Sequence, residues 1–298
     1  MTLFDGDPLI SPLGQFPGTS VNHIKVSPAG ARVLLAGSNG SQGIAALFST
    51  QGEMIGTFGN QMAPVFTANY SGDGQKIVTA SYDGSVSQWS AEGDPISNYK
   101  LEKAALCDAE YLPGGGLLVS SDNGSTSLWS SKGKLRKDYM SDGTARAVTV
   151  APNGKLLASA SDNGEVHLFA ERGRYLRTFQ TGGARINSLR FSENGKQLLI
   201  STYSGQAKVF SVTGKLRVAI KATAGGITNQ ATYIPGTERI ATAGSDGLVR
   251  FWSRAGDPLM SVTMPGSGQG VGVESIAFLP DGEQLFVAMT DRAIWQLS

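Results

Sequence analysis

The side chains that most often catalyse reactions or bind metals are scarce in this chain of 298 residues, which has two histidines, His23 and His167, and one cysteine, Cys107. The histidines fall in separate segments, NHIKV and EVHLF, with no Cys, Asp or Glu at the spacing of metal ligands. Because metal and catalytic sites need several convergent groups, we interpret both histidines as structural and Cys107 as a packed thiol. The sequence predicts no catalytic residue, metal or cofactor.

The acidic residues are spread singly, mostly in expected turns, with one exception. Asp108 and Glu110, in CDAEY, alternate on one face of an expected strand and are the one candidate for a paired acid site. We favour the interpretation that they form a solvated pair at a sheet edge. The GGG at 114–116 precedes an expected strand rather than a helix, so it does not indicate a phosphate-binding loop.

The elements that carry these side chains follow from a repeat centred on aromatic phrases such as VSQWSAEG, EVHLFAERG and VRFWSRAG. Its anchor positions lie 40–45 residues apart, and a glycine follows each of the first six anchors by four residues. A repeat of this length indicates an array or a propeller. We expect the anchors to pack between repeat units; they are Phe48, Trp89, Trp129, Phe169, Phe210, Trp252 and Leu297.

Each repeat unit is predicted to contain four strands joined by tight turns. Asx-Gly pairs such as Asp83-Gly84 and Asp246-Gly247 favour primed hairpin turns, in which positive φ is tolerated. The runs between turns, such as KIVTAS and KQLLIS, are apolar on both faces, so both faces must be covered. Four-stranded antiparallel sheets stacked radially satisfy this, and we predict an all-β, single seven-bladed β-propeller over 1–298. An open β-solenoid is disfavoured because it needs polar capping repeats.

The two ends of the chain carry matching segments, GDPLI at 6–10 and GDPLM at 256–260. The seventh unit stops one residue after its anchor, where the other units turn into their outermost strand. We therefore predict that residues about 6–13 supply the missing outer strand of the last blade. This pairing would close the ring and remove an exposed sheet edge.

The segments ASYDGSVSQWS at 80–90, AGSDGLVRFWS at 243–253 and FLPDG at 278–282 resemble the WD-repeat family, particularly its regular bacterial type, and the resemblance covers essentially the whole chain. It implies a non-catalytic platform for protein assemblies. Trp-Ser stands in place of the family's Trp-Asp, and the family's Gly-His pair is missing. Blade cohesion is therefore expected to depend more on aromatic and aliphatic packing.

One face of such a propeller gathers the turns between second and third strands and the loops before first strands. Tyr82 and Tyr203 lie in those turns, and Arg146 and Arg185 in or beside those loops. Tyrosine and arginine are frequent anchors of protein interfaces. These four residues are therefore candidates for partner binding.

The rim of the ring is predicted to be electrically polar. The residue after each recurring glycine is a cation in three consecutive units, Lys134, Arg174 and Lys215, and an anion in the other four: Glu53, Asp94, Asp257 and, after closure, Asp7. The cationic arc is reinforced by Lys132, Arg136, Lys137, Arg172, Arg177 and Arg217. Such a patch favours an acidic protein partner; nucleic acid or an anionic membrane surface is the less favoured alternative.

The remaining bulk properties exclude several classes of protein. The net charge of +1 provides no global attraction to nucleic acid or lipid, and no run approaches the roughly 20 apolar residues of a membrane span. With one cysteine and no recognisable signal peptide, we expect a soluble, cytoplasmic protein, monomeric by itself. The predicted function is a non-catalytic protein-interaction scaffold or assembly factor. The alternative is a propeller enzyme of the lactonase or lyase type, or a Ca²⁺-binding propeller with a central site.

Overall fold

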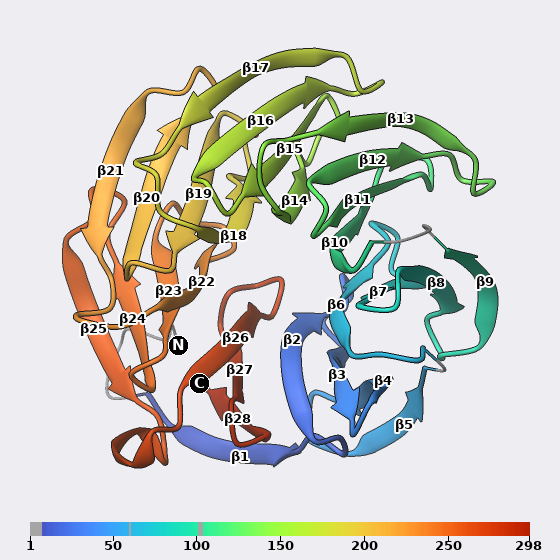
Figure 1. Ribbon diagram of the computed structural model, residues 1–298. Coiled ribbons are helices and arrows are strands. Elements are labelled where there is room, and N and C mark those ends of the chain that lie inside the picture. The colour runs from blue at the N-terminus through green and yellow to red at the C-terminus, as the bar shows by residue number, and fades with distance from the viewer. Residues whose placement is uncertain (1–7, 60, 101–103) are drawn as a thin grey trace.

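A computed structural model describes residues 8–59, 61–100 and 104–298. In this part of the chain, seven four-stranded antiparallel sheets are arranged as the blades of a ring (Figure 1). The predicted seven-bladed β-propeller is thus confirmed. The first strand of each of blades 1–6 lies against the central channel and the fourth lies at the rim; in blade 7 the inner strand is β26 (Figure 1).

The strands have the following bounds. Blade 1 contains β2 (Ser20–Val26), β3 (Arg32–Asn39), β4 (Gln42–Ser49) and β5 (Met54–Phe58). Blade 2 contains β6 (Val65–Tyr70), β7 (Lys76–Ser81), β8 (Ser85–Ser90) and β9 (Pro95–Lys100). Blade 3 contains β10 (Leu106–Tyr111), β11 (Leu117–Ser121), β12 (Ser125–Trp129) and β13 (Leu135–Met140). Blade 4 contains β14 (Ala145–Val150), β15 (Leu156–Ser161), β16 (Glu165–Ala170) and β17 (Tyr175–Gln180).

The other three blades follow the same plan. Blade 5 contains β18 (Ile186–Phe191), β19 (Gln197–Thr202), β20 (Gln206–Ser211) and β21 (Leu216–Lys221). Blade 6 contains β22 (Thr228–Tyr233), β23 (Ile240–Gly244), β24 (Leu248–Trp252) and β25 (Pro258–Thr263). Blade 7 contains β26 (Val273–Phe278), β27 (Leu285–Met289), β28 (Ala293–Leu297) and β1 (Ile10–Gln15). The described residues contain no helix that could cross a membrane; their helical element is the short turn η1 (Ser267–Gln269).

Turn chemistry explains where the strands reverse. Gly84 and Gly247 adopt φ of 82° and 78°, but Asp83 and Asp246 do not take a positive φ, so these are not the primed turns that the Asx-Gly pairs predicted. They match a type I turn that ends on a left-handed glycine, which explains why only the second residue of each pair has a positive φ. Arg292 stands where the corresponding glycine would be and still takes a positive φ of 75°, which is uncommon for a residue with a side chain. The backbone geometry of the turn is therefore imposed by the blade, and glycine is the residue that adopts it without strain.

The N-terminal strand closes the ring, as predicted. β1 pairs antiparallel with β28, from Ile10 opposite Leu297 to Gln15 opposite Ala293. Leu9 and Ser298 exchange two further backbone hydrogen bonds of 3.0 and 3.2 Å. Residues 6 and 7 of the predicted closing segment lie outside the described residues. The observed strand spans Ile10–Gln15, two residues beyond the predicted end at 13, with a register shift between Pro12 and Gly14.

Aromatic pairs join neighbouring blades near the rim. Phe58 of blade 1 packs on Trp89 of blade 2, with ring centroids 5.1 Å apart, and Tyr139 packs on Phe169 at 4.4 Å. Six of the seven anchor side chains are buried, whereas Trp129 is only half-buried and stacks on Tyr99 at 6.4 Å. At four junctions an outer-strand aromatic thus covers the anchor of the next blade, the other two pairs being Tyr99–Trp129 and Phe179–Phe210, and this packing provides contact between blades.

Candidate ligand pocket at the mouth of the central channel

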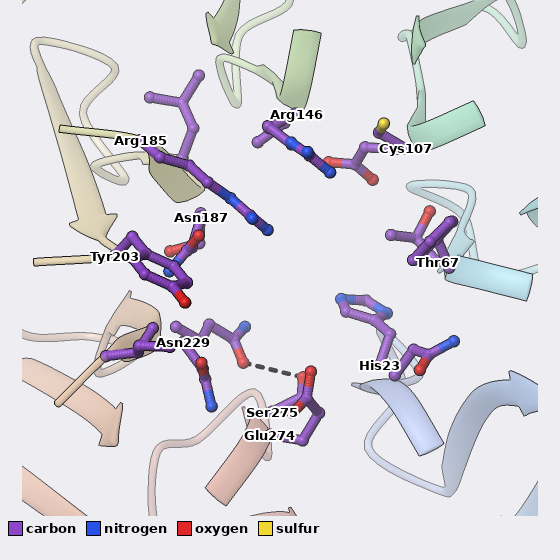
Figure 2. A pocket seen from close by; sticks show the side chains of 18 of the residues that line it. His23, Thr67, Cys107, Arg146, Arg185, Asn187, Tyr203, Asn229, Glu274 and Ser275 are labelled. Carbon is purple, nitrogen blue, oxygen red and sulfur yellow. Dashed lines mark hydrogen bonds between the residues drawn. The ribbon is translucent and has the colours of Figure 1, made fainter. Parts of the chain in front are cut away.

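The central channel opens at one end into a pocket of about 340 Å³, which Figure 2 shows from close by. Every blade contributes to its wall with the residues near the start of its inner strand. The pocket is therefore a product of the whole ring and not of any one repeat. Its volume lies at the small end of the range of roughly 300–1,000 Å³ that is usual for ligand sites.

A β-bulge in each inner strand builds this wall. The pairing register shifts at the same place in all seven blades, as between Ile186 and Ser188 in β18 and between Thr228 and Gln230 in β22. A bulge leaves one residue unpaired and re-aims its side chain. The seven bulge residues that line the pocket are Asn22, Phe66, Cys107, Arg146, Asn187, Asn229 and Glu274. The residues that follow them also line it: His23, Thr67, Asp108, Ala147, Ser188, Gln230 and Ser275.

Three of the bulge residues are asparagines that tie one blade to the next. The side-chain amide of Asn22 donates to the Val65 carbonyl at 2.8 Å. Asn187 donates to the Thr228 carbonyl at 3.1 Å, and Asn229 donates to the Val273 carbonyl at 2.8 Å. Inner strands of neighbouring blades belong to separate sheets, so these side chains supply hydrogen bonds between sheets that are not paired with each other.

The residues after the bulges make a second set of such bonds. Gln230 Oε1 accepts hydrogen bonds from the Ile276 N–H at 2.6 Å and from the Ser275 hydroxyl at 2.9 Å, the latter drawn as a dashed line in Figure 2. The Ser275 hydroxyl oxygen in turn accepts from the Ile24 N–H at 3.2 Å. Because these bonds connect β22, β26 and β2 in sequence, they hold the wall of the pocket in a defined shape.

The acidic pair Asp108 and Glu110 also bridges blades, which corrects our interpretation of a solvated edge pair. Asp108 is buried, and its carboxylate accepts from the backbone N–H of Val148 at 3.1 Å; the Glu110 carboxylate accepts from that of Val150 at 2.9 Å. Burial raises the pKa of both carboxyl groups, and the positive charge of Arg190 opposes that shift. The pair lies in the channel because β10 is an innermost strand, a property that its local pattern does not reveal.

The floor of the channel contains two basic and two acidic side chains. Lys25 and Arg190 supply two cations beside the carboxylates of Asp108 and Glu110. Burial, followed by repulsion from Arg190, lowers the pKa of Lys25 to about 8. Burial likewise lowers the pKa of His23 to about 3, so this imidazole is neutral at ordinary pH, and its Nδ1 donates to the Ala68 carbonyl at 3.1 Å.

The remaining candidate reactive groups are the Cys107 thiol and the His167 imidazole, and neither has the surroundings of an activated group. Burial raises the pKa of the Cys107 thiol to about 12, so the thiol stays protonated at neutral pH. His167 lies on β16, away from the channel, where its Nδ1 shares a hydrogen bond of 2.7 Å with the Thr178 hydroxyl. Within residues 8–59, 61–100 and 104–298, no three His, Cys, Asp or Glu side chains are grouped as metal ligands.

Three of the four loop-face candidates meet at this pocket. Arg146 and Arg185 reach into it from neighbouring blades, and the Arg185 guanidinium lies 5.4 Å from the centre of the Tyr203 ring (Figure 2). Tyr82 does not line the pocket; it is exposed and contacts the edge of Phe66, which does.

The asparagines, Gln230 and Glu274 were missed by the sequence reasoning, although a signal for them exists. Polar residues stand 22 residues before four of the anchors: Thr67, Ser188, Gln230 and Ser275. Val26, Cys107 and Ala147 hold this position in the other three units, so the spacing is only a partial signal of the channel wall.

The cationic arc predicted from the sequence, called the basic rim arc below, lies on the rim of the propeller and not at the pocket. Its nine side chains are all exposed, on or next to β13, β17 and β21: Lys132, Lys134, Arg136, Lys137, Arg172, Arg174, Arg177, Lys215 and Arg217. In the part of the chain that the structure describes, no ion pair engages any of them. The structure places the anionic counterparts Glu53, Asp94 and Asp257 on the rim of other blades, whereas Asp7 lies outside the described residues.

Comparison with known proteins agrees with this architecture. The family model described as WD domain, G-beta repeat, matches residues 52–90 and 137–169. Each match starts at the outer strand of one blade and ends with the third strand of the next, the same offset that makes β1 complete blade 7. No curated protein matches the chain. The two matched segments are similar to WD repeats, and the seven four-stranded blades in a closed ring are consistent with a propeller built from such repeats.

Proposed function

We propose that this protein is a non-catalytic interaction scaffold that docks an acidic protein partner on the basic rim arc, the nine cations of β13, β17, β21 and the turns before them. WD-repeat propellers commonly serve as protein-interaction scaffolds. The observation that carries the proposal is the segregation of rim charge: cations on three consecutive blades, in a chain whose net charge is only +1.

Apolar side chains accompany the cations and favour a protein over nucleic acid. Leu135, Tyr175 and Leu216 directly follow Lys134, Arg174 and Lys215 on the chain, and each is 45–52% exposed. Interfaces between proteins combine apolar and cationic contacts, whereas phosphate backbones are bound mainly by charge. Exposed apolar residues also occur on the anionic blades, for example Met54, so charge is what distinguishes the basic rim arc from the rest of the rim.

Charge reversal on the rim tests the proposal. The variant Lys134→Glu/Arg174→Glu/Lys215→Glu should lose an acidic protein that the wild type captures from nuclease-treated extract of the native cell. Capture by the wild type should fall as salt rises, because the Debye length shrinks from about 10 Å at 0.1 M to about 3 Å at 1 M. The melting temperature should stay unchanged, since all three side chains are exposed.

A matched control reverses three rim charges on other blades, Glu53→Lys/Asp94→Lys/Asp257→Lys, and should keep the partner. Quantitative mass spectrometry of the captured proteins provides the comparison. If the first variant captures the same proteins as the wild type, the basic rim arc is not a docking surface. If nuclease treatment removes everything that the wild type captures, the ligand is nucleic acid and the proposal is wrong.

A further inference from the structure

The mouth of the channel carries two cations that form no ion pair with a described residue. Arg146 projects from the bulge of β14, and Arg185 from the loop just before β18. Figure 2 shows both side chains reaching into the same cavity from adjacent blades. We propose that this pocket is a binding site for a small molecule with an oxyanion group, a carboxylate or a phosphate, held by Arg146 and Arg185.

The other charged groups of the channel interact with one another, which directs the oxyanion to these two residues. Lys25 and Arg190 lie close enough to the carboxyl groups of Asp108 and Glu110 to interact electrostatically, and both carboxyl groups also accept backbone N–H bonds. Burial raises the pKa of Glu274, which also lines the pocket, to about 7, so this group carries less negative charge than an exposed carboxylate.

The surroundings of Arg146 point to a missing partner. Its Nε is buried and has no hydrogen-bond partner among the described residues. A buried donor left unpaired costs about 1–3 kcal/mol, and more when it belongs to a charged group. An oxyanion at the mouth would accept this N–H, and guanidinium groups match carboxylate and phosphate oxygens with two parallel hydrogen bonds.

Arg185 is positioned by stacking instead of by an ion pair. Its guanidinium carbon lies 5.4 Å from the centre of the Tyr203 ring, within the range of a cation–π contact. Burial, followed by repulsion from Arg146, lowers the pKa of Arg185, and the negative charge of Asp162 partly opposes that shift. An anion between them would remove that repulsion.

The size and frame of the pocket favour a small molecule over a protein segment. About 340 Å³ accommodates a compact organic acid or phosphate ester. The asparagines of the wall already use their amides to hold neighbouring blades, so the frame is set before a ligand enters. The site is independent of the basic rim arc, which lies at the outer strands.

Isothermal titration with two probes, inorganic phosphate and malonate, tests the site in the full chain. We expect millimolar or tighter binding of at least one probe, weakened at least tenfold in Arg146→Gln and in Arg185→Gln. Binding of malonate alone would assign a carboxylate ligand, and binding of phosphate alone a phosphate ligand. The matched control Arg136→Gln, on the rim, should bind like the wild type, as should the rim variant Lys134→Glu/Arg174→Glu/Lys215→Glu. Failure of the rim proposal is thereby separated from failure of this one.

A second measurement uses the wild-type chain and avoids any effect of substitution on folding. Phenylglyoxal modifies accessible arginines, and mass spectrometry reports the extent at each site. The bound probe should protect Arg146 and Arg185 and leave Arg136 equally modified. Absence of binding for both probes, or binding that neither pocket variant weakens and that protects neither arginine, would overturn the proposal.

Discussion

Replacing Gln230 with leucine removes a side chain that makes two hydrogen bonds to the neighbouring inner strand, while keeping the side-chain volume nearly constant. In the wild type, Oε1 accepts from the Ile276 N–H at 2.6 Å and from the Ser275 hydroxyl at 2.9 Å, and the residue is buried. Leucine leaves the Ile276 N–H without its acceptor, at a cost of about 1–3 kcal/mol, and removes one hydroxyl hydrogen bond of about 1 kcal/mol. The expected loss of unfolding free energy is therefore about 2–4 kcal/mol.

Thermal and urea unfolding measure this loss. Unfolding entropy of about 2.1 cal/mol/K per residue, over 298 residues, converts about 2–4 kcal/mol into a fall of about 3–6 °C in melting temperature. In urea the midpoint should fall while the m-value stays constant, because the surface exposed on unfolding does not change. The matched control is Gln296→Leu on β28, a half-buried strand glutamine without a side-chain hydrogen bond in the described structure, which should cost less than about 0.5 kcal/mol.

A double-mutant cycle with Ser275→Ala isolates the bond between the two side chains. The coupling energy should be about 0.5–1.5 kcal/mol, the net value of one hydrogen bond. Two results would refute the reasoning: a loss for Gln230→Leu no larger than that of Gln296→Leu, or strict additivity with Ser275→Ala. Either would mean that the side-chain bridges of the channel wall do not stabilise the ring.

Four further perturbations follow from the same structure. Deleting residues 1–13 removes most of β1 and leaves β28 unpaired at its outer edge. The melting temperature should fall, and size-exclusion chromatography should show aggregates. An unchanged melting temperature together with a monomeric elution profile would contradict ring closure by this segment. Trp252→Ala, at a buried anchor, should lower the unfolding free energy by about 3–5 kcal/mol, and Trp129→Ala should lower it less because that side chain is half-buried. A larger loss for Trp129→Ala in denaturant unfolding would show that burial does not set the cost. The pKa of His23 falls from 6.5 to about 3 on folding, so between these values the unfolded chain binds a proton that the folded chain does not. The free energy of unfolding should therefore decline by about 1.4 kcal/mol per pH unit as pH falls from 6.5 toward 3. His23→Gln should lack this decline, and equal slopes of stability against pH in the variant and the wild type would refute the prediction. Burial raises the pKa of Glu274 from 4.5 to about 7, so the stability that its protonated form contributes is present below pH 4.5 and is lost as pH rises through 7. Glu274→Gln should therefore flatten the dependence of unfolding free energy on pH between about pH 5 and 8. An unaltered dependence would contradict the prediction.

Ring architecture was predictable because its determinants are local and repeated. The Asp246-Gly247 pair specifies a turn through its own backbone, and the alternation of apolar runs between such turns specifies strands covered on both faces. Repetition at about 40 residues then sets the number of blades, and the GDPL match at the two ends predicts the closing strand that the structure places against β28. None of these predictions depends on which residues of distant blades contact one another.

The channel wall depends on contacts between blades, and the local pattern does not encode them. Asp108 has the same alternation in sequence whether its strand lies at an exposed edge or innermost; only the convergence of seven inner strands buries it and aims its carboxylate at Val148. Arg146 and Arg185, 39 residues apart, face one cavity for the same reason. Sequence by itself determined the turns, the strands and the number of blades, because those are fixed by backbone preferences and by burial of each sheet face. The tertiary structure alone decided which polar side chains surround the axis and which charges remain without partners there, because both depend on the distances between blades.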